Sequence, residues 1–248
     1  MTPAPRRRAD QLLVERGLFE SRAKAQAAIA AGGVTADGRA VARASDMLAP
    51  DASLTATPAH PYVSRGGVKL AHALDLFGVA VAGRQALDVG ASTGGFSQAL
   101  LERGAAHVTA VDVGREQLHP SLRSHPRLLS LEETDIRALN AARLPAPPSL
   151  IVCDVSFAPL SAVLPAALAL ASADATLVAL VKPQFEVGKR DIGKNGVVKD
   201  PAARDRAVEA ARALVADLGF DVLGVTPSPI AGGDGNVEFL LAARRGHG

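Results

Sequence analysis

The chain has one cysteine and no tryptophan, and only 3% of its 248 residues are aromatic. A single thiol, Cys153, excludes an intramolecular disulfide framework and any zinc site built on several cysteines. That usage is typical of a reducing compartment, so we expect the protein to be cytoplasmic. The scarcity of aromatic rings leaves little material for stacking on nucleobases. Any nucleic-acid recognition would therefore depend mainly on charge and shape.

The sequence also lacks a convincing membrane span or secretion signal. The apolar stretch over residues 164–181 contains Pro165 and Asp174, and its second half has the β-branched character of a strand. It predicts a helix, a turn and a strand rather than a span. Asp10 and Glu15 interrupt the segment after the basic run Arg6–Arg8, and no apolar segment follows, so the run does not indicate a signal peptide.

Charge is nearly balanced over the chain, with a net charge of +2, but it is unevenly distributed. Residues 1–43 contain eight Lys or Arg against four Asp or Glu. This local excess of positive charge favours a nucleic-acid-binding module, with an ordinary solvated surface as the alternative.

The same region has clear signals for a small α+β module. Residues 9–17 predict a short amphipathic helix closed by a glycine. Ser21 can cap a second helix that ends near the glycine pair at 32–33. Asp37-Gly38 suits a tight hairpin turn that requires positive φ. We expect a first domain over residues 1–58 and a proline-containing linker over residues 59–64.

The remainder, residues 65–248, alternates between strand and helix patterns. The helix expected over residues 200–219 has Asp200 as cap, a proline at its first position and a glycine as stop. Strands are expected at residues 86–89, 107–113, 150–154, 176–181, 221–227 and 236–243. The alternation predicts a doubly wound, mainly parallel α/β sheet.

A glycine-rich turn follows the first of these strands in "LDVGASTGGF". Its spacing, Gly-x-x-x-Gly-Gly, differs from the dinucleotide-binding fingerprint and from the phosphate-binding P-loop. Asp88 before the turn fits a cationic ligand better than a pyrophosphate. Asp112, at the end of the next strand, is placed to accept hydrogen bonds from ribose hydroxyls.

Charged residues stand at the ends of the later strands. Asp154 ends one strand and Lys182 the next, and parallel strands open at their carboxyl ends to the same crevice. Lys69 precedes the first strand of this domain, and Glu238 lies in the last one. Cys153 alternates away from Asp154 along the strand, which favours a structural thiol.

Two parts of the chain resemble known families. The first module is similar to the αL-type RNA-binding domain of a ribosomal protein, pseudouridine synthases and tyrosyl-tRNA synthetases. The matching positions are Arg8, Asp10, Leu13, Arg16–Leu18, Ser21–Arg22, Ala25, Ile29, Gly33–Val34 and Val41. The glycine turn with its acidic partners resembles class I methyltransferases, and the ordered Lys69, Asp154, Lys182 and Glu238 resemble the tetrad of FtsJ-like ribose 2′-O-methyltransferases.

Together the motifs "YVSRGGVKL", "DVGASTGGF", "CDVSF", "LVKPQFEVGK", "GVVKD" and "GNVEF" resemble the hemolysin A/TlyA group of ribosomal RNA 2′-O-methyltransferases, over about residues 6–243. The resemblance implies a class I, Rossmann-like methyltransferase domain with a mainly parallel seven-stranded sheet. It also implies S-adenosylmethionine as cofactor and a cytidine ribose in ribosomal RNA or subunits as substrate. We expect neither a metal nor a membrane partner, and a monomer is favoured.

The resemblance also implies roles for particular residues. Lys182 would contact the 2′-hydroxyl, as general base if neutral and otherwise by stabilising the developing alkoxide, with Asp154 orienting it and Lys69 and Glu238 completing the network. The expected cofactor residues are Asp88, Gly90, Ala91, Ser92, Thr93, Gly94, Gly95, Phe96, Asp112, Val113, Asp135 and Ile136. The expected RNA-binding residues are Arg6, Arg8, Ser21, Arg22, Lys24 and Arg65.

Other functions remain as alternatives at this point. The motif after the fourth strand, "CDVSF", lacks the Asn/Asp-Pro-Pro-aromatic cluster of amino-directed base methyltransferases, and a single cysteine disfavours methylation of pyrimidine carbon five. A non-catalytic RNA-binding or ribosome-assembly protein could use the same fold. A pore-forming hemolysin would require a membrane-active segment.

Overall fold

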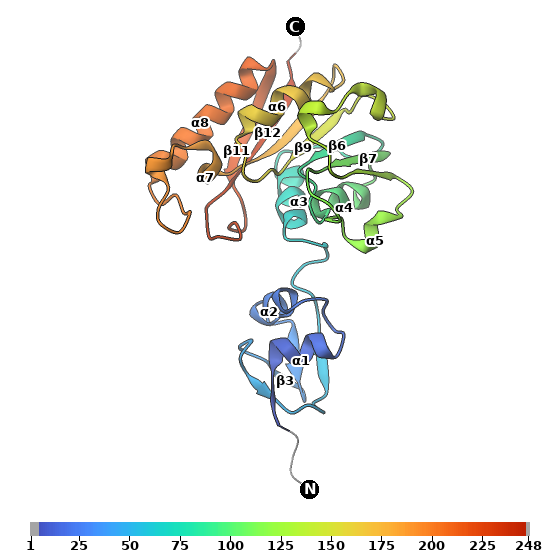
Figure 1. The fold of residues 1–248 in the computed structure, drawn as a ribbon, viewed down its shortest axis with the longest axis vertical. Helices are drawn as coiled ribbons and strands as arrows, with labels where there is room; N and C mark the ends of the chain where they lie inside the picture. The colour runs from blue at the N-terminus through green and yellow to red at the C-terminus, as the bar shows by residue number, and fades with distance from the viewer. Residues whose placement is uncertain (1–4, 247–248) are drawn as a thin grey trace. The chain divides into compact units, whose positions relative to one another are not determined.

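The computed structural model describes residues 5–246 and divides into two compact units, Met1–Pro61 and Tyr62–Gly248 (Figure 1). The expected linker, residues 59–64, spans this division. Its last residues belong to the second unit, where the Val63 amide donates a 2.6 Å hydrogen bond to Gln98 Oε1.

The first unit is a small α+β fold. Its elements are β1 (Arg7–Arg8), α1 (Ala9–Glu15), α2 (Arg22–Ala30), β2 (Val34–Ala36), β3 (Arg39–Ala40), β4 (Met47–Leu48) and β5 (Leu54–Ala56). Strands β1 and β4 form an antiparallel pair, and β3, β2 and β5 form a second antiparallel sheet in that order. The two helices bury Leu13, Ala25 and Ile29 against Val34 of β2.

The local signals in this unit act as expected. The Ser21 hydroxyl accepts a hydrogen bond from the Lys24 amide and caps α2. Asp37 and Gly38 have φ of 49° and 76°, so both adopt the left-handed conformation that a tight hairpin between β2 and β3 requires. The predicted pair of helices followed by a hairpin is confirmed.

The second unit alternates strands and helices along the chain. Its main elements are α3 (Gly66–Leu76), β6 (Gln85–Val89), α4 (Gly95–Glu102), β7 (His107–Val111), α5 (Pro120–Arg123), β8 (Leu128–Leu131), β9 (Leu150–Cys153), α6 (Leu160–Ala169), β10 (Thr176–Val181), α7 (Pro183–Glu186), α8 (Pro201–Asp217), β11 (Phe220–Pro227) and β12 (Phe239–Arg245). Short 3₁₀ turns lie at η1 (Ile136–Ala138), η2 (Ala141–Arg143) and η3 (Lys189–Asp191).

The strands of this unit form one seven-stranded sheet in the order β11-β12-β10-β9-β6-β7-β8. β12 is antiparallel to both of its neighbours, and the ladders among β10, β9, β6, β7 and β8 are parallel. The predicted α/β class and the mainly parallel seven-stranded sheet are confirmed. β8 had no individual sequence prediction, because it is a four-residue, partly exposed edge strand.

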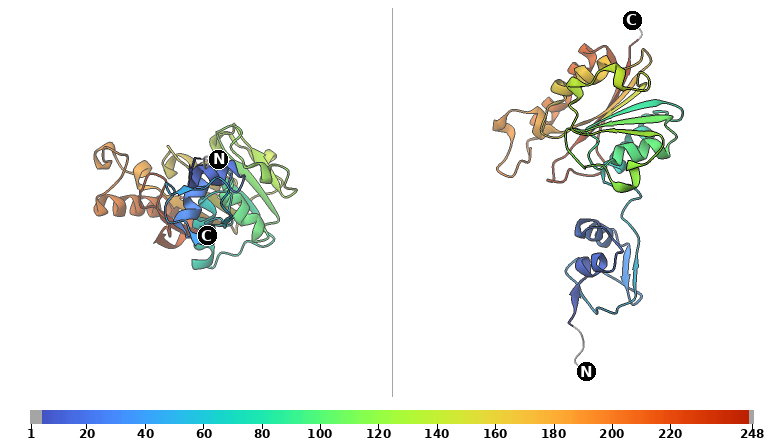
Figure 2. Two further views of the ribbon diagram at one scale, coloured as in Figure 1. Left: turned by 90° about the horizontal axis from the view of Figure 1, so that it is seen from below. Right: turned by 45° about the vertical axis from the view of Figure 1, so that its right-hand side comes forward.

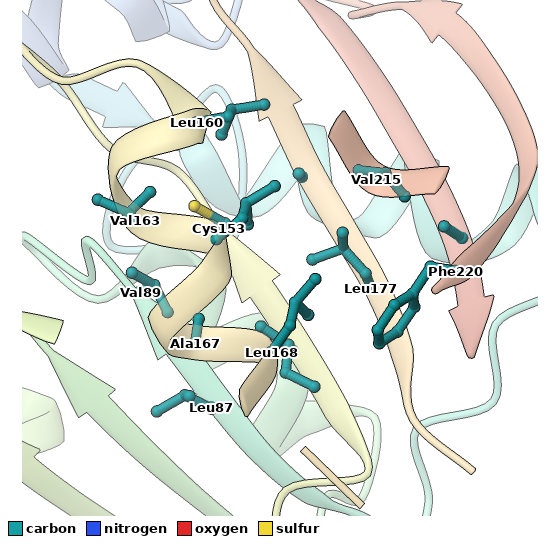
Figure 3. Close-up of a cluster of buried hydrophobic side chains, with 14 of the residues drawn as sticks. Leu87, Val89, Cys153, Leu160, Val163, Ala167, Leu168, Leu177, Val215 and Phe220 are labelled. Carbon is teal, nitrogen blue, oxygen red and sulfur yellow. The ribbon is translucent and has the colours of Figure 1, made fainter. Parts of the chain in front are cut away.

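Helices cover both faces of the sheet (Figure 2). Alternation along the strands divides the core into two layers. One layer contains Leu177 and Cys153 with α6 and α8 (Figure 3), and the other contains Val178 and Val152 with α3 and α4. The Cys153 thiol is fully buried and burial raises its pKa, as expected of a structural cysteine.

The apolar stretch over residues 164–181 forms the second half of α6, a turn and β10, as predicted. Among the residues described, no helix combines the length and the apolar character needed to cross a membrane.

The contribution of the helix cap Asp200 to the stability of α8 can be tested by mutation. The Asp200 carboxylate accepts a 3.1 Å hydrogen bond from the Ala202 amide. Asp200→Ala is expected to lower the free energy of unfolding by about 1 kcal/mol in urea denaturation. Asp205→Ala, which removes the same charge from an exposed position inside the helix, should cost clearly less. Equal losses for the two variants would contradict a capping role.

Candidate active site

Strand register brings three of the four predicted catalytic residues to one face and one edge of the sheet. Asp154 follows β9 and Lys182 follows β10, at the carboxyl ends of parallel neighbours. Glu238 precedes the antiparallel β12, whose Phe239 is paired with Val181. By alternation, these three residues lie on the face that α3 covers, and α3 carries Lys69.

The four side chains form two ion pairs. Lys182 Nζ lies 2.7 Å from Asp154 Oδ1 and donates a 2.9 Å hydrogen bond to Ser156 Oγ. Lys69 Nζ pairs with Glu238 Oε2. Lys69, Lys182 and Glu238 are buried, whereas Asp154 is partly exposed. Lysine and glutamate are rarely buried unless paired. The burial of these ion pairs therefore indicates a functional site rather than ordinary surface charges.

A cavity of ≈ 580 Å³ lies at the carboxyl ends of β6, β7 and β9. The predicted cofactor residues that line it are Gly90, Ser92, Asp112, Val113, Asp135 and Ile136. Asp154 lines it too. The residue that pairs with Lys182 is therefore also part of the cavity wall.

The glycine turn shapes one wall of the cavity. Gly90 has φ of +81°, and a Cβ at this position would lie 2.7 Å from the backbone oxygen of Asp154. Only glycine allows this approach of two strand ends. Asp112 fixes the far side of the turn, because its two carboxylate oxygens accept 2.7 Å hydrogen bonds from the amides of Ser92 and Gly114.

Asp88 lies behind the turn and is completely buried. Ser97 Oγ donates a 2.7 Å hydrogen bond to its Oδ2, while Oδ1 has no hydrogen-bond partner among the residues described. Burial raises the pKa of Asp88 to about 7, and the nearby carboxylates of Asp154 and Asp112 contribute to the same effect.

The other predicted cofactor residues surround the turn without lining the cavity. They are Ala91, Thr93, Gly94, Gly95 and Phe96, of which the last two begin α4. Asp135 caps η1 through the amide of Arg137 and forms a 2.5 Å ion pair with the side chain of Arg137, which holds the pKa of Asp135 down to about 2.

Three residues of the cavity wall, Val155, Ser156 and Phe157, belong to the quoted motif "CDVSF" but were not predicted as site residues. Ser156 accepts the hydrogen bond from Lys182. Phe157 is 91% exposed, has φ of 67°, and its ring centre lies 5.5 Å from that of Phe185. An aromatic residue three positions after a strand-end carboxylate was the available sequence signal.

The predicted RNA-binding residues are mostly held by other side chains. Arg8 and Arg22 both pair with Asp10, Lys24 pairs with Glu20, and the Ser21 hydroxyl caps α2. Arg6 makes one long hydrogen bond, of 3.5 Å, to the backbone of Met47. Arg65 belongs to the second unit, where it is exposed at the start of α3. Across residues 5–246 no group of three or more His, Cys, Asp or Glu side chains could hold a metal ion.

The raised pKa of Asp88 predicts how stability depends on pH. Its folded-state pKa lies above the ordinary 3.8, so folding favours the protonated form. The group therefore lowers stability progressively as pH rises from about 4 to about 7. Asp88→Asn should remove this loss, giving a smaller decrease in unfolding free energy between about pH 5 and about pH 8 than in the unmodified protein.

Asp135→Asn is the matched control for that measurement. The pKa of Asp135 is lowered, so this carboxylate is ionised in both folded and unfolded chains throughout the same pH range. The control should leave the pH dependence unchanged. Identical profiles for Asp88→Asn and the unmodified protein would contradict the assignment of a protonated, buried Asp88.

Comparisons with protein families and curated sequences indicate a methyltransferase, as the arrangement of the candidate site does. The model of the FtsJ-like methyltransferase family matches residues 62–245, and that of the S4 domain matches residues 7–53. The 16S/23S rRNA (cytidine-2′-O)-methyltransferase TlyA of Mycobacterium tuberculosis is 47% identical over 97% of this chain and 91% of its own length.

Two solved structures have folds similar to that of this chain. A protein from Streptococcus thermophilus named as a hemolysin is 38% identical, with a TM-score of 0.76, over 98% of this chain and 89% of that one. An S-adenosylmethionine-dependent methyltransferase structure from Listeria monocytogenes, at 15% identity, shares the fold with a TM-score of 0.56 over 74% of this chain and all of that one. The chain therefore belongs to the FtsJ-like methyltransferase family, in the hemolysin A/TlyA group whose methyltransferase domain follows an S4 domain.

Proposed function

We propose that this protein transfers a methyl group from S-adenosylmethionine to a ribose 2′-hydroxyl of ribosomal RNA, with cytidine as the target nucleoside. The observation that carries the proposal is the position of Asp154, which lines the cavity and pairs with Lys182. One carboxylate thus joins the candidate cofactor site to the candidate catalytic base. The printed activity of the M. tuberculosis relative supports the same substrate class.

The cavity suits S-adenosylmethionine in size and in chemistry. Its volume falls within the range of sites for small molecules and cofactors. Asp112 has carboxylate lone pairs available for ribose hydroxyls, and the Gly90 turn leaves room for close backbone contact. The negative charge around Asp112 and Asp154 favours a cationic ligand. When bound, the sulfonium cofactor supplies an electrophilic methyl group.

The protein's own contribution would be to prepare the acceptor hydroxyl. A ribose 2′-hydroxyl is a weak nucleophile at neutral pH and needs a base or a stabilising cation. Lys182 is held by Asp154 and Ser156, so its amine has a fixed position beside the cavity. It would accept the hydroxyl proton or stabilise the developing alkoxide. The ion pair between Lys69 of α3 and Glu238, just before β12, would complete the hydrogen-bond network around the acceptor ribose.

The two units would have separate functions. The S4 unit, over residues 1–58, would bind RNA through its basic side chains, and residues 65–248 would perform the chemistry after the linker at residues 59–64. We also propose a cytoplasmic location, because ribosomal RNA is the proposed substrate.

The cofactor site can be tested separately from catalysis. Asp112→Asn removes the negative charge that holds the turn and would bind the ribose, so S-adenosylmethionine affinity should fall about ten-fold or more in calorimetric titration. RNA affinity should be unchanged. Glu133→Gln removes a charge from an exposed residue two positions beyond β8 that does not line the cavity, and it should bind the cofactor normally. Equal affinities for both variants would rule out Asp112 as a cofactor ligand.

Catalysis is tested by methyl transfer from labelled S-adenosylmethionine to purified ribosomal subunits. Lys182→Ala should reduce the rate by at least about a hundred-fold, because the base or stabilising cation is lost. Cofactor and RNA binding should persist. Lys199→Ala, at an exposed lysine, is the control and should remain active. If the unmodified protein binds cofactor and RNA yet transfers nothing, it is a non-catalytic RNA-binding protein and the proposal is wrong.

A further inference from the structure

The chain between β7 and α5 forms part of the cavity wall, and we call residues 113–119 the β7–α5 loop. Three of its residues line the cavity, namely Val113, Gly114 and Gln117. The loop contains bends but no helix or strand, so regular secondary structure does not hold its conformation. Its backbone amides therefore need partners from other segments of the fold.

A single carboxylate, that of Glu132, accepts hydrogen bonds from three consecutive amides of this loop. Oε2 accepts a 2.7 Å bond from the Glu116 amide, and Oε1 accepts bonds of 2.7 Å and 2.8 Å from the amides of Gln117 and Leu118. Glu132 directly follows β8 and does not itself line the cavity. Successive amides that converge in this way form a nest for an anion, and here the anion is a side chain of the same unit.

The nest requires an uncommon backbone conformation at Glu116, whose φ is 53°. This left-handed conformation is unfavourable for a residue with a Cβ, so the hydrogen bonds to Glu132 help to offset its cost. The bond from the Leu118 amide, together with those from Glu116 and Gln117, holds the pKa of Glu132 below its usual range. The acceptor is therefore ionised at neutral pH, which strengthens each bond.

The end of the β7–α5 loop contacts the glycine turn, which forms another part of the cavity wall. The Leu118 side chain is buried, and its Cδ1 lies 2.7 Å from the position that a Cβ on Gly94 would occupy. The His119 amide donates a 3.1 Å hydrogen bond to the carbonyl oxygen of Thr93. A displacement of this loop would therefore disturb the glycine turn as well.

The start of the loop is held by Asp112, which accepts a 2.7 Å hydrogen bond from the Gly114 amide. Gln117 folds back over this position, since its Cγ lies 2.7 Å from where a Cβ on Gly114 would be. The loop thus connects the carboxylate of Asp112 to the glycine turn. Glu132 binds the part of the loop between these two ends.

We propose that Glu132 is a positioning residue for cofactor binding. Its carboxylate keeps the β7–α5 loop in the conformation that forms the cavity wall beside Asp112, before the cofactor arrives. This inference rests on the cavity being the S-adenosylmethionine site, as proposed above. A loop that occupies other conformations lowers the apparent affinity by the fraction of molecules that cannot bind, and preorganisation removes this cost.

Glu132→Gln tests the role with little change in shape. The variant is neutral and places an NH₂ group against amides that need an acceptor. In hydrogen–deuterium exchange of the protein without cofactor, the amides of residues 116–118 should exchange at least about ten-fold faster. In calorimetric titration, S-adenosylmethionine affinity should fall about five-fold or more. Glu133→Gln is the matched control, because it removes the same charge from the exposed neighbouring residue, and it should change neither measurement.

A purely electrostatic role of Glu132 gives different results. Glu132→Asp keeps the charge but withdraws the carboxylate by one methylene, so it should lose nearly as much affinity as Glu132→Gln. S-adenosylhomocysteine lacks the sulfonium charge, yet its affinity should fall by the same factor as that of S-adenosylmethionine. Normal affinity in Glu132→Asp, or a loss confined to S-adenosylmethionine, would overturn the positioning role.

Methyl transfer separates cofactor positioning from a general loss of structure. Glu132→Gln should raise KM for S-adenosylmethionine by the same factor as Kd, while kcat at saturating cofactor stays within about two-fold and RNA affinity is unchanged. A lower kcat with unchanged KM would contradict the inference. Normal cofactor binding by Glu132→Gln would overturn this inference alone. Absence of S-adenosylmethionine binding by the unmodified protein would overturn the proposed function as well.

Discussion

The geometry of the candidate site depends on the pairing of Lys182 with Asp154 across two neighbouring parallel strands. β9 and β10 are buried on both faces, so the direction in which their ends present side chains is fixed by the core rather than by loop conformation. Asp154 of this pair lines the cavity, and the antiparallel β12 places Glu238 next to the end of β10. A charged site of this kind needs a rigid support, because two ion pairs with buried lysines tolerate little displacement.

Much of this arrangement could be predicted from sequence because it follows local and periodic rules. Ser21 and Asp200 are helix caps, Asp37-Gly38 is a hairpin turn, and the alternation of strands and helices implies a parallel sheet. The order of Lys69, Asp154, Lys182 and Glu238 along the chain indicated a common site, since parallel strands open to one edge.

The partners within the site could not be predicted, because they depend on sheet order and on side-chain burial. The order of the four residues predicted one network, whereas in the structure they form two ion pairs, Lys69 with Glu238 and Lys182 with Asp154. Arg8 and Arg22 were predicted as RNA-binding residues, and the structure shows in addition that both pair with Asp10. Asp10 lies in the first turn of a helix, where an acidic residue is ordinary, so its pairing with Arg22 of α2 could be seen only in the folded structure.

The central claim is that these strand ends activate a ribose hydroxyl rather than a base. Mass spectrometry of nucleosides from ribosomal RNA, after incubation of purified subunits with the protein and S-adenosylmethionine, tests it most directly. The account predicts a new 2′-O-methylated nucleoside, 2′-O-methylcytidine. A methyl group found on a base, or no new modified nucleoside, would contradict it.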